Sequence, residues 1–468
     1  MILLFQNVKR CLLICAFALA VAVCPLLTAS AQTRTLRIVT YNIQADFTNA
    51  VYPTWSSVGP PLPGLIAPPS NTNNFQAGGV LEGLGEELVN GNAQPIDILA
   101  LQETTSNPVT VAPIVNGLNT FYNSPGMFTN SSYQGTESGG NPAFGNGPNA
   151  IVFNCRTVQL LASTPVDPPG GTGQLGSSSG EYREVMRYKF APAGVATNGS
   201  NIFYVYVSHY KSGSSSSFSI TNSRAGEASI VRSNMVALPA GSRVIYAGDF
   251  NTGDASEPMY GILTAPGTNQ LTDPLNPARS LTTNWDNSLV PQDLTESATF
   301  LEYRDDYEMM TTNAYFGTPG GLKLISGTYH VFGNNGTTPY FGSVNSGSNT
   351  ALNNHLVTNG PVFISAAQLY LDLTNASDHL PVVADYTIPV PAPLITGISL
   401  AGTNLVATVA NCATGGVYVV LMSTNLSLPP TNWTALATNV ANSGSFTLTA
   451  TNAVNPASSK RFFLLQLR

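Results

Sequence analysis

The sequence predicts a layered α/β domain followed by a small all-β domain. The α/β domain is predicted because short apolar, β-branched or aromatic runs alternate with stretches of helical spacing. A run with proline at alternate positions, residues 388–393 (IPVPAP), then interrupts the pattern. Only short strand-like runs follow it, up to Arg468.

The composition excludes a disordered chain and a general basic coat for polyanions. Of the 468 residues, 43% are hydrophobic and 9% are charged. A disordered chain needs many charges and few apolar residues, whereas this chain has enough apolar residues for a large core. Lysine and arginine total 18 against 25 acidic residues, a formal net charge of −7. Any phosphate binding must therefore come from a local site.

Residues 1–31 have the layout of a secretory signal peptide. Lys9 and Arg10 precede an apolar run over residues 11–27, and small residues before the cleavage site end at Ala31. Cleavage there leaves 16 basic against 25 acidic residues, a net charge of −9. We therefore expect an acidic mature protein that is secreted or periplasmic and has no stable membrane span.

Two alternatives to a cleaved signal, and one question about the cysteines, stay open. A membrane anchor would need a charged stop-transfer patch, and none follows the apolar run. A lipoprotein signal is disfavoured because Val23, which is not a small residue, precedes Cys24. The mature chain keeps Cys155 and Cys412, which make no disulfide framework, although a single bridge between them is not excluded.

Four buried strands are predicted in the first part of the chain, and each ends on a polar residue. Such residues are ordinary turn formers when taken singly, but four in succession with metal-binding or acid–base chemistry favour a site. If the strands lie side by side, their ends bring these side chains to one edge. The strands are residues 36–41 before Asn42, residues 96–102 before Glu103, residues 202–208 before His209, and residues 243–248 before Asp249 and Asn251.

Helices and loops are predicted between and after these strands. One helix covers Phe75–Asn90, with apolar residues at helical spacing and Gly91 as a stop. A second covers Thr221–Leu238 before Pro239, and Glu227 is expected to be a charge on its surface. Three Gly-, Ser- and Asn-rich stretches predict long surface loops: Asn123–Pro148, Pro165–Gly180 and Tyr329–Asn354.

After the proline-rich run, the sequence predicts a β-sandwich of immunoglobulin-like or fibronectin-like type. Six strand-like runs follow, and the segment contains no His, Asp or Glu, so it lacks the usual catalytic groups. Trp433 is expected in its core in preference to a sugar-stacking role. The expected organisation is a signal peptide over 1–31, a main domain over 32–388, a linker over 389–393 and a β-sandwich module over 394–468.

Five motifs, taken in order, carry a family resemblance. They are Asn42 in VTYNIQ, Glu103 in LALQET, His209 in VSHYKSG, Asp249 and Asn251 in AGDFNT, and Asp378 with His379 in SDHLPV. Over about residues 36–388 the chain resembles the endonuclease/exonuclease/phosphatase superfamily, which includes deoxyribonucleases, sphingomyelinases and inositol-polyphosphate phosphatases. The resemblance implies a four-layer sandwich, with two central β-sheets flanked by helices, and a metal-dependent phosphoric ester hydrolase.

The resemblance implies a divalent metal site. Hydrolysis of a phosphodiester needs a cation to neutralise developing charge, and hard oxygen ligands suit Mg²⁺ or Mn²⁺. By resemblance Glu103 and Asn42 hold this metal, and Asp378 adds a second metal contact. A plainer interpretation of Glu103 is that it caps the following loop.

The resemblance also assigns acid–base roles. Asp249 orients or deprotonates the attacking water, and Asn251 donates hydrogen bonds to the phosphate. His379 is the general base or transition-state stabiliser, with its tautomer fixed by Asp306. Asp305 is the alternative partner, because strand alternation lets only one of the two adjacent carboxylates face the site. The two residues of the AGDFNT motif could instead build an Asx turn.

Basic residues and histidines complete the expected substrate site. His209 occupies the position of a phosphate-binding imidazole. The stretch VSHYKSG followed by NSR is similar to extracellular bacterial nucleases and makes Lys211 and Arg224 candidate phosphate-binding cations. Arg183 in YREVMRYKF is a third, or else it pairs with Glu181 or Glu184. Two further histidines, His330 and His355, are expected to be solvated.

The leading hypothesis is a secreted nuclease that hydrolyses phosphodiester bonds of nucleic acid. One alternative is a sphingomyelinase-like phospholipase or a sugar or inositol phosphate phosphatase; aromatic residues over 332–341 are the feature that would suit a membrane. The other is an inactive scaffold whose C-terminal module binds a cell surface or polymer. Endo or exo cleavage, the number of metals and the oligomeric state stay open.

Overall fold

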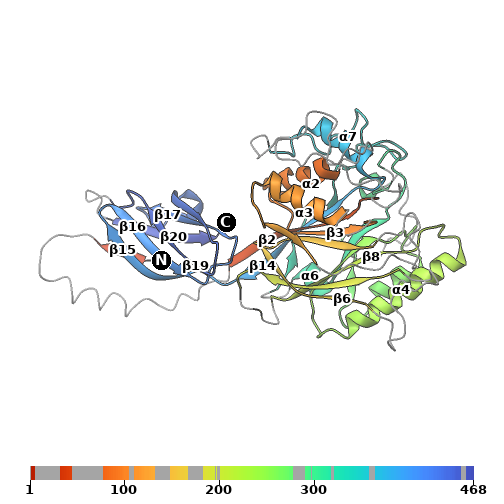
Figure 1. The fold of residues 1–468 in the computed structure, drawn as a ribbon, viewed down its shortest axis with the longest axis horizontal. Helices are drawn as coiled ribbons and strands as arrows, with labels where there is room; N and C mark the ends of the chain where they lie inside the picture. The colour runs from red at the N-terminus through yellow and green to blue at the C-terminus, as the bar shows by residue number, and fades with distance from the viewer. Residues whose placement is uncertain are drawn as a thin grey trace, which may run out of the picture. The chain divides into compact units, whose positions relative to one another are not determined.

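A computed structural model describes most of the chain, and its strands and helices form two compact units (Figure 1). The main unit is Thr35–Ala191 with Asn198–Ile388, and the C-terminal unit is Met1–Arg34, Pro192–Thr197 and Pro389–Arg468. The described residues are 2–5, 32–44, 77–104, 110–131, 148–166, 183–195, 197, 201–277, 290–296, 298–317, 321–357, 364–454 and 460–467.

The main unit contains two mixed β-sheets. Both are built largely from strands that are separated in sequence by helices or loops, so their order is not the chain order. The six-stranded sheet runs β10 (Leu271–Thr272), β11 (Asp306–Thr311), β9 (Val244–Asp249), β8 (Phe203–His209), β7 (Met186–Pro192) and β6 (Val158–Pro165). The seven-stranded sheet runs β12 (Lys323–Leu324), β14 (Val382–Val390), β2 (Gln32–Asn42), β3 (Ile98–Gln102), β5 (Ala150–Asn154) and β4 (Phe128–Asn130), with β13 (His330–Val331) also paired to β14.

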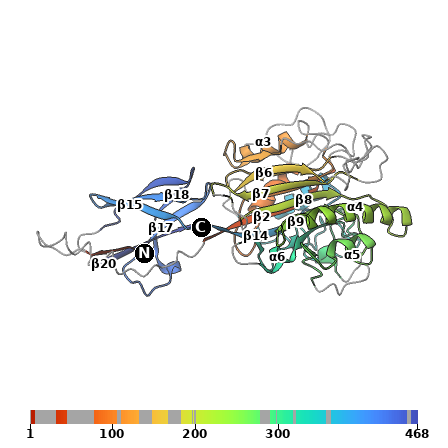
Figure 2. The ribbon, with the colours of Figure 1, turned by 90° about the horizontal axis from the view of Figure 1, so that it is seen from below.

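Helices cover the outer face of each sheet. Three helices pack on the seven-stranded sheet, and two pack beside β8 and β9 of the other (Figures 1 and 2). Residues of both sheets share one apolar cluster between them, so the four-layer sandwich expected from the motifs is confirmed. The helices are α2 (Ala77–Glu86), α3 (Ala112–Phe121) and α7 (Ala366–Ala376) on one side, α4 (Phe218–Val236) and α5 (Pro258–Thr264) on the other, and the short α6 (Thr312–Phe316) after β11.

The central strands are apolar on both faces because both faces are covered. In β8, Val205 and Val207 point into the cluster between the sheets, whereas Tyr206 packs under α4 and α5. On β9, Ile245 likewise points into the cluster between the sheets, and Tyr246 packs under the helices. A strand buried on both faces has an unbroken apolar sequence, and this is why the sequence predicted these strands.

One helix boundary and one loop environment differ from the expectation. The helix predicted over Phe75–Asn90 ends at Glu86, because the next residues leave it to form a bridge between Glu87 and Leu356. The stretch Tyr329–Asn354 is rich in turns but is not only a surface loop. It contributes Phe332, Val344 and Leu352 to the core under α2 and α7.

The C-terminal unit is a sandwich of two antiparallel sheets, and all six strands expected after residue 393 are present. Val409, Tyr418 and Leu448 belong to its single apolar core. Trp433 is half-buried at its margin and donates its indole N–H to the carbonyl of Leu428, so the expectation that it belongs to the core is wrong. The strands are β15 (Leu394–Ala401), β16 (Asn404–Ala410) and β19 (Ser445–Ala450) in one sheet, and β17 (Val417–Ser423), β18 (Thr434–Val440) and β20 (Lys460–Leu467) in the other.

Two features at the edges of the expected domains add detail. Strand β14 continues to Val390, so the predicted linker over 389–393 begins inside a strand. Residues Ile2–Phe5 form β1, which pairs with β20, whereas residues 6–31 of the predicted signal peptide lie outside the described residues.

Cys155 and Cys412 are free thiols. Within the described part of the chain, no helix is long and apolar enough to span a membrane.

Candidate active site

The ends of three neighbouring strands in the six-stranded sheet bring three titratable groups together. Strand register places His209 beside Asp249 in the parallel pair β8–β9, and Asp306 beside Asp249 in the antiparallel pair β11–β9. Gly248 permits this close pairing, because a Cβ there would lie 2.1 Å from the carbonyl oxygen of Ser208. The "AGD" part of the motif thus has a packing reason as well as a chemical one.

The facing sheet supplies an amide and a carboxylate at the same edge. Parallel pairing of β2 and β3 aligns Asn42 with Gln102, and Glu103 follows directly. Glu103 has φ of 53° and Asn251 has φ of 49°, both in the left-handed region. That conformation is uncommon for glutamate and costs free energy, so it is typical of residues held at functional sites.

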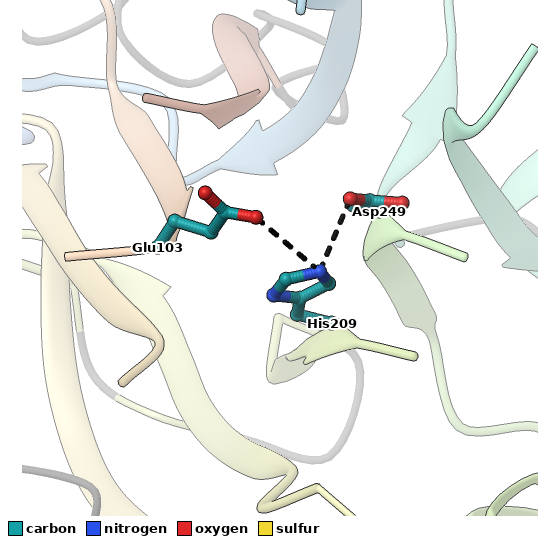
Figure 3. A group of neighbouring side chains, drawn as sticks. All are labelled: Glu103, His209 and Asp249. Carbon is teal, nitrogen blue, oxygen red and sulfur yellow. Dashed lines mark ion pairs between the residues drawn. The ribbon is translucent and has the colours of Figure 1, made fainter. Parts of the chain in front are cut away.

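Glu103, His209 and Asp249 point toward one another from the two sheets (Figure 3). Nε2 of His209 lies 3.6 Å from Oε1 of Glu103 and 3.3 Å from Oδ2 of Asp249. Asn42 donates from Nδ2 to the same Asp249 oxygen at 3.0 Å. Two carboxylates, an amide and an imidazole therefore converge at one place, as the strand-end pattern predicted.

Burial shifts the pKa values of His209 and Asp249 in opposite directions. Burial lowers the pKa of His209 well below its ordinary value, and the charges of Arg183 and Lys211 act in the same direction. These effects favour the neutral imidazole of His209. Burial raises the pKa of Asp249 to about 7, against the opposing effect of His379. A carboxyl group with a pKa near neutrality can take up and release a proton at physiological pH.

A histidine–carboxylate pair faces this centre from the other side. Nδ1 of His379 lies 2.7 Å from Oδ2 of Asp306. Burial acts to lower the pKa of His379, but Asp306 and Asp378 hold it well above its ordinary value. The pair directs Nε2 of His379 toward Asp249, 3.9 Å away. Asp305, the alternative partner, is not bonded to His379; its backbone carbonyl accepts from Phe250 N–H.

Glu296 is a neighbour of this pair that the sequence did not reveal. It forms an antiparallel bridge with His379 and groups with Asp378 and His379 as a possible ligand set. Asp378 itself accepts a hydrogen bond from Gln44 at 2.8 Å. Glu296 belongs to no motif, and only the bridge, which joins residues far apart in the chain, brings it to the site.

The described residues fit a divalent cation. Candidate ligand groups are Glu103, His209 and Asp249; Asp249, Asp306 and His379; and Glu296, Asp378 and His379. The predicted ligand Asp378 is thus grouped with Glu296 and not with Glu103. Oδ1 of Asp306 is buried and has no hydrogen-bond partner among the described residues. Carboxylate-rich sets of this kind suit Mg²⁺ or Mn²⁺.

Arg183 lies close to the site and is buried against α4. Its backbone N–H donates to Oε2 of Glu227, and Ser208 donates to the other oxygen of that carboxylate at 2.8 Å. Burial raises the pKa of Glu227 to about 8, although Ser208 and Arg183 act to lower it. The expectation that Glu227 is a surface charge is therefore wrong. Glu181, one alternative partner of Arg183, lies outside the described residues.

The other predicted cations differ in exposure. Lys211 is half-exposed, whereas Arg224 is fully buried and holds Glu257 at 2.7 Å. Arg224 therefore cannot meet a phosphate directly, which corrects the expected contact. Nδ2 of Asn251, the expected phosphate donor, donates to Oδ1 of Asp249 at 2.8 Å and to the carbonyl of Tyr210 at 3.2 Å.

Comparisons with known proteins give structural likeness only. No family profile matches the chain, and no curated protein is similar to it. The human Nocturnin catalytic domain with bound sulfate is 15% identical, covering 76% of this chain and 97% of its own, with a TM-score of 0.42. An endonuclease/exonuclease/phosphatase family protein from Bacteroides thetaiotaomicron is 13% identical over 77% and 97%, with a TM-score of 0.37. D. rerio TDP2 in complex with a single-strand DNA product is 14% identical over 75% and 98%, with a TM-score of 0.38.

Proposed function

We propose that this chain is a divalent-metal-dependent phosphodiester hydrolase of the endonuclease/exonuclease/phosphatase superfamily. The observation that carries the proposal is the convergence of Glu103, His209 and Asp249 with the His379–Asp306 pair at one edge of the sandwich. These groups come from separate strands of both sheets. A purely structural role would not require so many buried ionisable groups at one place, because each costs free energy to bury.

Each group has a role in the proposed reaction. Mg²⁺ or Mn²⁺ held by Glu103 and Asn42 would neutralise negative charge on the phosphate oxygens. Asp249 accepts a proton from the attacking water, which suits its pKa of about 7. The protonated His379, held by Asp306, hydrogen-bonds the phosphate oxygens as negative charge grows on them. His209, as a neutral imidazole, donates a hydrogen bond to the phosphate.

Nucleic acid is the first proposed substrate. Support comes from the similarity of the VSHYKSG and NSR stretches to exported nucleases and from two cations near the site. Arg183 and Lys211 both act on His209. Because the mature chain is expected to be acidic, binding that depends on so few cations should weaken as salt concentration rises.

A phospholipid is the second candidate, and an exposed aromatic patch favours it. Phe300 and Phe341 are 49% and 45% exposed, and their rings stack with centroids 4.8 Å apart. Aromatic side chains exposed in this way are typical of surfaces that dock on a membrane. Phe341 lies in the segment 332–341, where the sequence placed its scattered aromatics.

Export and the role of the C-terminal unit are further parts of the proposal. The signal-peptide layout of residues 1–31 supports a secreted or periplasmic protein. The C-terminal unit, which has no acidic residue or histidine after residue 393, would bind a cell surface or polymer. The inactive-scaffold alternative is disfavoured because the candidate catalytic set is complete.

One panel of assays tests the proposal. The exported protein, with Mg²⁺, is incubated with bis(p-nitrophenyl) phosphate, linear DNA, RNA and sphingomyelin vesicles, beside the Asp249→Asn variant. We expect hydrolysis of the nitrophenyl diester and of DNA by the wild type and at least about 100-fold less by the variant. Turnover of sphingomyelin alone would support the phospholipid. Equal rates for wild type and variant on every substrate would exclude the proposed site.

A further inference from the structure

A cavity of about 670 Å³ opens beside the candidate active site. Its walls come from the loop after β8, the loop after β9 and the hairpin that carries Glu296. Asn251, a residue of the candidate active site, is one of the lining residues. Its volume is in the range of pockets that take a small organic group. The described lining residues are Ser212, Gly213, Ser214, Ser215, Ser216, Asn251, Gly253, Asp254, Glu296, Tyr303 and Asp305.

The charged residues among the described lining residues are all acidic. Asp254, Glu296 and Asp305 supply three carboxylates, and serine hydroxyls supply most of the remaining polar groups. None of the described lining residues is Lys, Arg or His. A second phosphate would meet like charges here, which is unfavourable in a partly enclosed site. Hydroxyl and ring groups, by contrast, find donors, acceptors and the 40% exposed Tyr303.

The two loops of the cavity are held by one buried ion pair. Arg224 of α4 donates to the carbonyls of Lys211 and Gly213 and to Glu257. Glu257 in turn accepts from the backbone N–H of Gly253 at 3.0 Å. The serine-rich loop and the loop after β9 are therefore fixed to the same pair, so this part of the cavity wall is formed before any ligand binds.

We propose that the cavity receives one of the two groups esterified to the scissile phosphate, and that this group carries no second phosphate. The inference rests on the proposed function and adds a substrate class to it. Water adds across the ester: its oxygen joins phosphorus, the bond from phosphorus to the leaving oxygen breaks, and that oxygen takes up a proton. Single phosphodiesters and the terminal bonds of a nucleic acid meet this requirement, whereas internal bonds of a long polyanion do not.

Closed circular DNA provides the first test, because every bond in it has phosphates on both sides. We measure rates per bond on a dinucleoside monophosphate, on a linear duplex and on the same DNA as a covalently closed circle. We expect at least about tenfold faster cleavage of the dinucleotide than of the circle, and attack on the linear form from its ends. Nicking of the circle at the dinucleotide rate would overturn the inference.

The same panel separates this inference from the proposed function. Failure to hydrolyse any diester, including bis(p-nitrophenyl) phosphate, would refute the proposed function. Hydrolysis with equal preference for the circle would refute only the cavity assignment. Cleavage of sphingomyelin with no cleavage of either DNA form also supports the assignment, because the choline head group carries no second phosphate.

Charge reversal on the cavity wall provides the second test. Asp254→Lys should raise nicking of the circle relative to the dinucleotide by about fivefold or more, because it replaces a repulsive charge by an attractive one. Glu302→Lys is the matched control: Glu302 is half-exposed on the hairpin of Tyr303 but does not line the cavity. Equal substrate ratios in the two variants would contradict the inference.

Arg224 is assigned as a positioning residue. Arg224→Met should raise KM for the dinucleotide several-fold with a smaller change in kcat, because the loops lose their common anchor. Arg232→Met is the matched control, since Arg232 lies on the same helix and its guanidinium donates to carbonyls such as that of Thr268, away from the cavity. A purely structural role would lower the melting temperature in both variants and leave KM unchanged in both. If Arg224→Met does not fold, the Asp254 variant decides.

Discussion

The main unit and the C-terminal unit are both built on β-sheets, but they differ in their content of buried acidic residues and histidines. The main unit buries His209, Asp249 and Asp306, each at most 2% exposed, where its strands end. From residue 394 onward the C-terminal unit contains no Asp, Glu or His at all, and its core is apolar. Buried charge costs stability unless it is paired, so its concentration in one region marks where chemistry is expected.

The two units also differ in the types of residue that adopt a strained backbone conformation. In the C-terminal unit the non-glycine residues with positive φ are asparagines, at 411 and 452, and asparagine tolerates this conformation in turns. In the main unit Gln44, Glu103 and Phe341 also adopt it, and Glu103 does so next to His209. A glutamate has no comparable local stabilisation, so the surrounding packing holds it there. Local turn chemistry therefore accounts for the asparagines and the candidate site for Glu103, while Phe341 shows that such strain is not confined to the site.

The largest effect expected in the main unit follows removal of divalent metal. Excess EDTA should abolish hydrolysis, and Mg²⁺ or Mn²⁺ should restore it, because Glu103 and Asn42 offer hard oxygen donors. Initial rates on bis(p-nitrophenyl) phosphate provide the measurement. Full activity in excess chelator would show that the buried carboxylates of the main unit hold no catalytic metal.

Substitutions at the strand ends should have the next largest effect. His379→Ala and Asp249→Asn should each lower kcat about 100-fold or more, the scale of general acid–base groups. Circular dichroism should be unchanged, and the exposed His355→Gln is the control that keeps normal kcat. A folded variant at either of the first two positions that retains most activity would contradict the assigned roles.

A partly buried ion pair away from the site should make stability depend on pH. His330 was expected to be solvated, but its Nε2 lies 2.8 Å from Glu87 and its Nδ1 lies 2.7 Å from the carbonyl of Thr328. Both nitrogens face acceptors, so the imidazolium is favoured. Burial acts to lower the pKa of His330, but Glu87 raises it above its ordinary value. The pKa of Glu87 is lowered by His330 and Arg37 in spite of burial.

The sign of each contribution follows from these directions. Stability from His330 is complete below its unfolded pKa near 6.5 and is lost as pH rises through the higher folded pKa. Stability from Glu87 is present above about 4.5 and is lost as pH falls through the lower folded pKa. His330→Gln should therefore lower the free energy of unfolding by about 1–3 kcal/mol near pH 6. Urea titrations of the variant and the wild type at pH 6 and pH 9 test this; an equal loss at both values would contradict it.

The smallest effect is expected from removal of the C-terminal unit. A chain ending at Ile388 should keep kcat and KM for small diesters within about twofold, because no catalytic group lies beyond that residue. Val195, which packs in the C-terminal core, would become exposed, so Val195→Thr should be combined with the truncation to keep it soluble. Loss of activity in a soluble truncated protein would show that the C-terminal unit contributes to the chemistry.

The sequence alone determined the features that depend on local pattern. Apolar runs predicted the central strands because they are buried on both faces, and the polar residue after each run marked the strand end. Alternation along β11 was enough to restrict the partner of His379 to one of two adjacent carboxylates, and the structure selects Asp306. All six strands predicted after residue 393 followed from their apolar, strand-like runs.

Only the tertiary structure decided the features that depend on which distant element covers a residue. Glu296 reaches the site through a bridge to His379, which no local pattern encodes. Glu227 and Arg224 look like ordinary charges of a surface helix, yet the loops and strands packed against α4 bury both. Burial, pKa and pairing of such residues are set by contacts across the fold, because a side chain's exposure depends on its neighbours in space and not on its neighbours in sequence.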